Sequence, residues 1–194
     1  RTVTLRAGGG MSRAFEPGLY VGVLPDGMLA VMDTATYRVK VVGMDGVPAR
    51  VLERPIEPRE VTRRDQEDEK ARRLAALESS GGPRIVMRTE QGTTSMLGGE
   101  VRRMMEDQIG AMEFAEVVPV VAGLGVDWSG RIWLERSGRR VGERGPVDLL
   151  TADGQYLGTL APGATLLPDA FGPEGLAAFI ERDELDVPRV VVRR

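Results

Sequence analysis

Histidine and cysteine are both absent from the 194 residues of the chain. Without them, no disulfide, zinc–thiolate site or imidazole–metal bond can form within this sequence. A Ser-His-Asp or Cys-His mechanism is likewise excluded, unless a partner or a further segment supplies the histidine. The groups that remain for binding or catalysis are carboxylates, guanidinium groups, hydroxyls and the backbone.

Lysine and long apolar runs are scarce too. All but Lys40 and Lys70 of the 26 basic residues are arginine, and they are interspersed with 29 acidic residues. This pattern lacks the basic stripe typical of nucleic-acid binding. No apolar run reaches the roughly 18 residues that suggest a membrane-spanning helix, so we expect no span. The chain begins at Arg1 in strand-like sequence without a signal peptide, and we expect it to be a piece of a longer protein.

A strand, a tight turn with a polar residue before glycine, and a second strand form a unit that occurs three times. The copies span residues 23–32, 126–135 and 170–179, and their turns contain Gly27, Gly130 and Gly175. Glycine takes a positive φ angle at low cost, as such turns require.

The first two copies belong to longer units of one order: strand, turn, strand, strand, Asp-Gly turn, strand. Their second turns are Asp45-Gly46 and Asp153-Gly154. Four short strands joined locally predict an antiparallel meander of the size of a propeller blade. The predicted strands are 2–6, then 19–24, 28–33, 37–42 and 48–53, then 117–126, 131–136, 147–152 and 156–160, and finally 166–171, 176–181 and 189–193.

Residues 58–115 are predicted to be an insertion of helices and loops between two blades. Thr62 followed by Asp65 is a capping-box pattern, and Asp68–Arg72 and Glu69–Arg73 have the spacing of helical ion pairs. We predict a mostly solvated helix within 58–80, a mobile loop over 83–99 with a short strand near 85–87, and an amphipathic helix over 100–112.

The repeated order of these motifs carries a resemblance to a known family. The motifs are Asp26-Gly27, Tyr37-Arg38-Val39, Asp45-Gly46, Asp127…Gly130-Arg131-Ile132-Trp133, Asp153-Gly154 and Asp183-Glu184-Leu185-Asp186-Val187-Pro188. The sequence resembles the NHL-type six-bladed β-propellers of bacterial secreted or periplasmic proteins. The resemblance implies an all-β fold: about three four-stranded antiparallel blades of a partial propeller, forming a single unit over residues 1–194 with the helical insertion, in a periplasmic or secreted protein.

Four residues are candidates for ligand binding: Tyr37, Arg38, Trp133 and Arg136. An aromatic ring beside an arginine can bind a planar or anionic group. The alternative is packing between blades, because Trp133 lies between Ile132 and Leu134. Asp33 and Asp127 are interpreted as turn residues, and the carboxylates of 183–186 as a solvated hairpin loop, since they lack the spacing of a calcium loop. We therefore predict no metal ligand, no cofactor and no catalytic residue.

Two functions from different classes remain open. The first is a non-catalytic binding or scaffold module that holds a protein, peptide or glycan through its loops and central channel. The alternative is a propeller hydrolase, resembling lactonases, that uses a channel metal or carboxylates. A purely structural repeat in an envelope protein is a third possibility. The sequence leaves open whether the protein is an enzyme.

Overall fold

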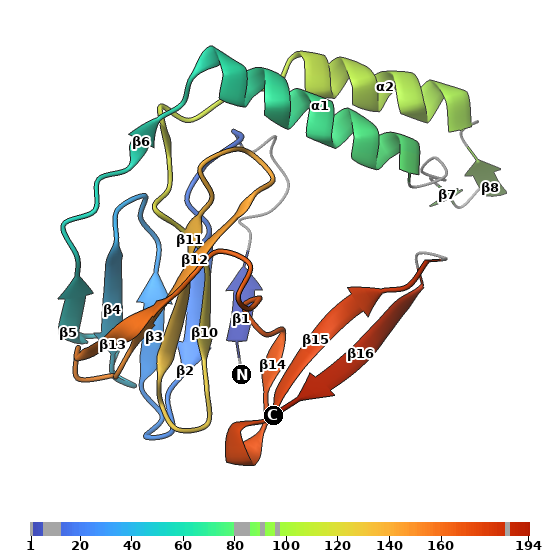
Figure 1. Cartoon of the computed structure of the whole chain (residues 1–194). Helices are drawn as coiled ribbons and strands as arrows, with labels where there is room; N and C mark the ends of the chain where they lie inside the picture. The colour runs from blue at the N-terminus through green and yellow to red at the C-terminus, as the bar shows by residue number, and fades with distance from the viewer. Residues whose placement is uncertain (1, 6–12, 80–85, 90–91, 96–97, 185–186) are drawn as a thin grey trace.

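The computed structural model describes residues 2–5, 13–79, 86–89, 92–95, 98–184 and 187–194. The chain forms mostly β-strands in antiparallel sheets, together with two α-helices (Figure 1). The prediction of an all-β protein with a helical insertion is confirmed at this level. The sheets do not close into a barrel or ring within the described residues.

The first sheet has five strands in the order in which they occur along the chain. They are β1 (Thr2–Leu5), β2 (Leu19–Val23), β3 (Leu29–Met32), β4 (Arg38–Val42) and β5 (Pro48–Glu53). The second sheet has four strands, again in sequence order. They are β10 (Val121–Val126), β11 (Ile132–Ser137), β12 (Arg144–Leu150) and β13 (Tyr156–Leu160). Both meanders have the predicted order of strands, and β1 adds a fifth strand by pairing with β2. The strand predicted over residues 117–126 is divided, because residues 117–118 belong to another sheet.

The predicted glycine turns join these strands. Gly27, Gly46, Gly130 and Gly154 have φ angles of 84°, 78°, 83° and 96°. Aspartates in the turns accept backbone hydrogen bonds, for example from the Met28 amide to Asp26 Oδ1 at 3.0 Å. The turns have the predicted geometry because glycine adopts positive φ angles at low cost and the aspartate side chain accepts a hydrogen bond from a backbone amide of the turn.

The first two sheets pack face to face and bury the main core. The first sheet contributes Ala30, Met32, Val39 and other buried residues, and the second contributes Leu124, Val126, Ile132, Leu134 and Leu150. Contact is closest between β2 and β10, where a Cβ atom on Gly22 would lie 2.3 Å from Cγ2 of Val126. Side chains alternate along a strand, so this face of β10 is covered by β2.

The third sheet begins against the opposite face of β10. It comprises β14 (Ala170–Phe171), β15 (Ala177–Arg182) and β16 (Pro188–Arg193), with a 3₁₀ turn, η1 (Pro173–Gly175), after β14. A Cβ on Gly125 would lie 2.8 Å from the Phe171 ring, which also packs against Trp133 with ring centroids 5.4 Å apart. Strand β14 of this sheet is shorter than the strand predicted over residues 166–171. The second sheet is therefore enclosed by the first sheet and by the start of the third.

One face of the third sheet is apolar and exposed. Ile180 pairs with Val190, and Ala178 pairs with Val192, so these four side chains lie on the same face. Ile180, Val190 and Val192 are 60%, 68% and 59% exposed. Contiguous exposed apolar surface of this kind often marks an interaction site.

The insertion forms two helices beside the sheets (Figure 1). Its elements are β6 (Arg59–Glu60), α1 (Arg63–Ser79), β7 (Val86–Thr89), β8 (Gly92–Ser95), α2 (Gly98–Gly110) and β9 (Val117–Val118). Both helices were predicted, whereas β8 and the pairing of β6 with β9 were not. Neither described helix has the length and apolarity needed to cross a bilayer.

The capping box at the start of α1 is confirmed. The Thr62 amide donates to Asp65 Oδ2 at 2.9 Å, and the Asp65 amide donates to Thr62 Oγ1 at 3.2 Å. Of the two predicted ion pairs, Glu69–Arg73 forms at 2.7 Å. Asp68–Arg72 does not form, because Arg72 turns to Glu69 and Asp68 lies near Arg64 instead.

We expect the capping box to make α1 sensitive to acid. A hydrogen bond from Arg59 is the largest cause that keeps the pKa of Asp65 well below its usual range, even though burial opposes ionisation. A carboxyl whose folded-state pKa is lowered stabilises the fold above its unfolded pKa of about 3.9, and this contribution is lost as the pH falls further. Asp65→Asn should lower the free energy of unfolding by about 1 to 2 kcal/mol at pH 7. Thermal unfolding of both proteins between pH 7 and pH 2 should show the difference shrinking below pH 4; a difference independent of pH would contradict this prediction.

Candidate functional site

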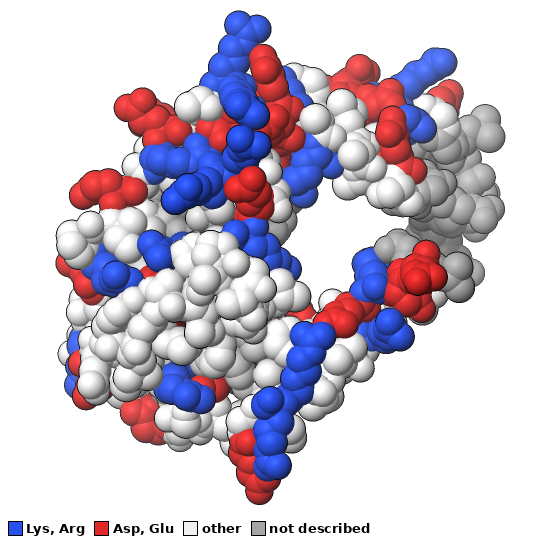
Figure 2. All heavy atoms as spheres, in the orientation of Figure 1, with Lys and Arg blue, Asp and Glu red and all other residues white. Residues whose placement is uncertain are grey.

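A cleft of about 640 Å³ lies at one end of the first two sheets. It is located where β2 and β10 begin and where β3 and β11 end. Its walls come from residues 13–20, from β6 and α1, and from the loop of residues 138–143 between β11 and β12. Charged side chains gather around α1 and this end of the sheets, whereas the surface of the sheets below is mostly uncharged (Figure 2).

Arginines of α1 line the cleft and are held by a buried carboxylate. Glu69 is 5% exposed, and it accepts hydrogen bonds from Arg72 Nε and Nη2 and from Arg73 Nε, each at 2.7 Å. Although burial opposes ionisation, these hydrogen bonds hold the pKa of Glu69 below its usual range. The ionised carboxylate fixes both guanidinium groups on the wall of the cleft.

Arg59 is held in the same way. Its Nη1 and Nη2 donate to the two carboxylate oxygens of Asp65 at 2.6 and 2.8 Å, while its buried Nε has no hydrogen-bond partner among the described residues. The ladder of β6 with β9 places Arg59 opposite Val118, which leads into β10. Within α1, all of whose residues are described, the two buried side chains are Asp65 and Glu69. Both serve to orient arginines, and leucine and alanine positions such as Leu74 are left exposed.

The loop of residues 138–143 forms another wall of the cleft. Arg140 lines the cleft and is exposed; its carbonyl oxygen accepts a hydrogen bond from the Glu143 amide, but its guanidinium group makes no hydrogen bond or ion pair with another described residue. Gly142, with a φ angle of 82°, passes close to α1, since a Cβ there would lie 3.7 Å from Cδ of Arg72. The loop and the helix therefore meet at one side of the cleft.

Phe15, on a third wall, has an unusual backbone conformation. Its φ angle is 66°, which is uncommon for a bulky residue and costs about 1 to 3 kcal/mol. The Ala14 amide donates to the Glu113 carbonyl oxygen, and the Ala115 amide donates to that of Ala14. The Phe15 ring packs against the Phe114 ring, with ring centroids 6.0 Å apart. Such conformations persist where surrounding contacts enforce them, often at functional sites.

The four predicted ligand-binding residues do not form one site. Tyr37 and Arg136 meet at Asp148, which is fully buried on the face of the second sheet that packs against the first. Arg54 Nη1 donates to Asp148 Oδ2 at 2.7 Å, and Arg136 Nε lies 3.4 Å from the same oxygen. Thr159 donates to the other oxygen. We call these groups the Asp148 network; it connects the two sheets, and none of its residues lines the cleft.

Removal of the Tyr37 hydroxyl is expected to leave stability unchanged or slightly raised. Burial, followed by the charge of Asp148, raises the pKa of Tyr37, so the hydroxyl remains protonated. Its oxygen is buried near Asp148 and Arg54 but forms no hydrogen bond of regular geometry within the described residues. Because a buried, unpaired hydroxyl is unfavourable, Tyr37→Phe should change the free energy of unfolding by less than about 1 kcal/mol. Urea unfolding measures this; a larger loss would show that the hydroxyl is bonded to Asp148.

Arg38 and Trp133 lie elsewhere. Arg38 forms an exposed ion pair with Glu53 on the neighbouring strand. The Trp133 indole donates to Asp127 Oδ2 at 3.1 Å while its ring packs on Phe171. Asp127 also accepts hydrogen bonds from Ser129 and Arg131, as the turn interpretation predicted. Asp33 departs from that interpretation, because it pairs with Lys40 at 2.9 Å.

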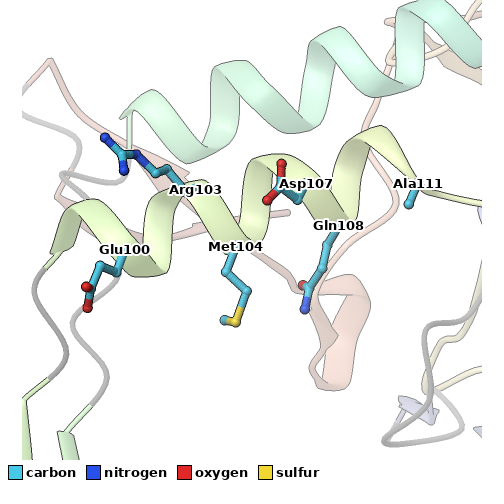
Figure 3. Close-up of a pocket in the computed structure, with 6 residues that line it drawn as sticks. All are labelled: Glu100, Arg103, Met104, Asp107, Gln108 and Ala111. Carbon is cyan, nitrogen blue, oxygen red and sulfur yellow. The ribbon is translucent and has the colours of Figure 1, made fainter.

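A second hollow runs along the free side of α2 (Figure 3). Met104 and Gln108 point away from α1 there. All its lining residues come from α2 and the residue that follows it, so it is an open helix face rather than a site between elements. The cleft, with walls from several parts of the chain, is the better candidate for ligand binding.

No cluster of three or more acidic side chains suited to a metal ion occurs within the described residues. The predicted hairpin loop at 183–186 lies partly outside them, at residues 185 and 186.

Comparison with models of known protein families finds no match, and comparison with curated proteins finds none either. Sequence pattern and geometry are therefore what point to a function. Sequence reasoning missed the arginines of the cleft. The one available signal was the spacing of Glu69 with Arg72 and Arg73, which is that of neighbours on a helix surface.

Proposed function

We propose that the chain contributes consecutive blades to an NHL-type β-propeller and acts as a non-catalytic module that binds a protein, peptide or glycan through its loops. The observation that carries this proposal is the enclosure of the second sheet. Leu124 and Val126 of β10 contact Gly22 of the first sheet, while Gly123 and Gly125 contact Leu167 and Phe171 on the other side. Successive meanders stacked face to face in chain order are the arrangement of propeller blades.

The exposed face of the third sheet supports the same proposal. A sheet whose Ile180, Val190 and Val192 side chains face solvent has the composition of a sheet that packs against another. A further blade would cover these residues in the way that the first sheet covers the second.

The loops at the cleft end support binding. In a blade, the strands provide a rigid scaffold and the loops between them carry function. Here the loop of residues 138–143, the insertion helix α1 and the segment 13–20 converge on one concavity. No comparable convergence surrounds Trp133, whose ring packs on Phe171.

Binding and turnover should be measured together on the folded chain. Biolayer interferometry against panels of peptides and oligosaccharides should give saturable binding of at least one class. Replacing Arg140 and Val141, which line the cleft, with glycine and serine should abolish it without changing the circular dichroism spectrum.

The matched assay uses lactone and ester substrates with added Ca²⁺ or with EDTA. We expect no turnover above buffer and no effect of either additive on the thermal midpoint, since a ligand of the folded state would raise it. Turnover that EDTA removes would overturn the proposal in favour of a propeller hydrolase.

A further inference from the structure

The cleft concentrates guanidinium groups that are fixed in place but only partly used. Arg73 employs Nε for Glu69, and its two remaining nitrogens have no partner among the described residues. Arg72 employs Nε and Nη2, which leaves Nη1. Arg140 belongs to the loop of residues 138–143, and none of its side-chain donors forms a hydrogen bond with a described residue.

The positions of these groups are determined by the protein. One carboxylate, Glu69, neutralises two arginines only in part, so a positive charge remains on this wall. Because the ion pairs immobilise Arg72 and Arg73 in advance, a ligand bound by them would lose less side-chain entropy than one bound by free arginines. A planar guanidinium presents donors that match the oxygens of a carboxylate or phosphate.

Two acidic side chains on the lining are engaged with basic groups, and two are not. Glu69 is engaged with its two arginines, and Asp33 is bonded to Lys40 at 2.9 Å. Glu143 and Glu16 remain, against Arg140 and the unused donors of α1, because Arg13 is paired with Glu113 at 3.1 Å. Glu143 lies on the same loop as Arg140, and it should weaken the binding of an anion rather than assist it.

We propose that the cleft binds a small polyanion, one that carries two or more carboxylate or phosphate groups. The first group lies between Arg72 and Arg73, and the second is reached by Arg140. A volume of about 640 Å³ falls in the range of small-molecule sites. This inference rests on the proposed binding function and specifies its ligand.

Isothermal titration of the chain with citrate and with pyrophosphate tests the proposal, at constant ionic strength set with NaCl. We expect saturable binding of at least one anion; the stronger ligand tells whether carboxylate or phosphate chemistry is preferred. Arg140→Glu should weaken binding by about tenfold or more, because a charge-assisted contact is replaced by repulsion. Glu143→Gln should strengthen it.

Arg139→Glu is the matched control. Arg139 adjoins Arg140, is equally exposed and without a described partner, but does not line the cleft. Absence of binding by both anions, or equal loss in the two arginine variants, would overturn the proposal. If peptides or oligosaccharides still bind in that case, the cleft assignment alone is wrong; if nothing binds, the proposed module function fails as well.

Discussion

Asp148→Ala is expected to lower the free energy of unfolding by about 3 to 5 kcal/mol. Asp148 is fully buried, and it pairs with Arg54 from beyond β5 and with Arg136 from β11. The side chains of both arginines are largely buried, at 31% and 27% exposed, so loss of the carboxylate leaves two positive charges facing each other in a poorly solvated space. Removing one partner of a buried ion pair destabilises the fold more than replacing both partners with apolar residues, because the remaining charge is uncompensated. Equilibrium unfolding in urea measures the change.

Glu53→Ala is the control for this prediction. It removes a carboxylate from the exposed pair with Arg38, for which the cost should be below about 1 kcal/mol. A double variant, Asp148→Leu with Arg54→Met, should recover part of the loss, because it removes one of the two unpaired positive charges and leaves that of Arg136. If Asp148→Ala costs no more than Glu53→Ala, the Asp148 network does not hold the two sheets together.

Gly22→Ala should destabilise the packing of β2 on β10 by about 1 to 3 kcal/mol. The added Cβ would lie 2.3 Å from Cγ2 of Val126 and 2.9 Å from Cδ2 of Leu124. Both neighbours belong to the buried core, so they cannot move away without disturbing other contacts. The thermal midpoint and the urea midpoint should both fall.

Two further variants separate this clash from general effects of the substitution. Gly99→Ala places a methyl group on α2 where no atom lies within 4 Å, and it should leave stability unchanged or slightly higher. Val126→Ala, added to Gly22→Ala, should restore part of the lost stability by making room for the new methyl group. A Gly22→Ala protein as stable as the original would show that the first two sheets are not in close contact at this point.

Local features of the fold could be predicted from the sequence. The strands beside Gly27 and Gly130, the turn geometry of Asp127 and the capping box of Thr62 all depend on residues within a few positions of one another. Propensity and hydrogen-bonding chemistry determine such features before any tertiary contact forms. The strand-turn-strand pattern therefore predicted most strands of the first two sheets to within a few residues of their observed bounds.

The contacts that make up the candidate site depend on residues far apart in the sequence. Arg54 and Asp148 are separated by 94 positions, and nothing near either residue indicates that they meet. By spacing, Arg72 could equally have paired with Asp68; in the structure it pairs with Glu69, which is buried and also binds Arg73. Trp133 was correctly expected to pack between sheets as one alternative, but its partner, Phe171, could be identified only in three dimensions.

Strand β16 has a consequence for the behaviour of the chain in solution. It lies at the edge of the third sheet as described, with Val190 and Val192 exposed, so its outer backbone groups can pair with a strand from another molecule. Pro188 at its start supplies no N–H donor, and Arg189 and Arg193 add positive charge along the same strand. Natural sheets use these devices against amyloid-like association. Arg193 is partly neutralised by its ion pair with Glu181. When the apolar face is uncovered, repulsion between the arginines of β16 on separate molecules should oppose association, and high salt, which screens that repulsion, should favour self-assembly.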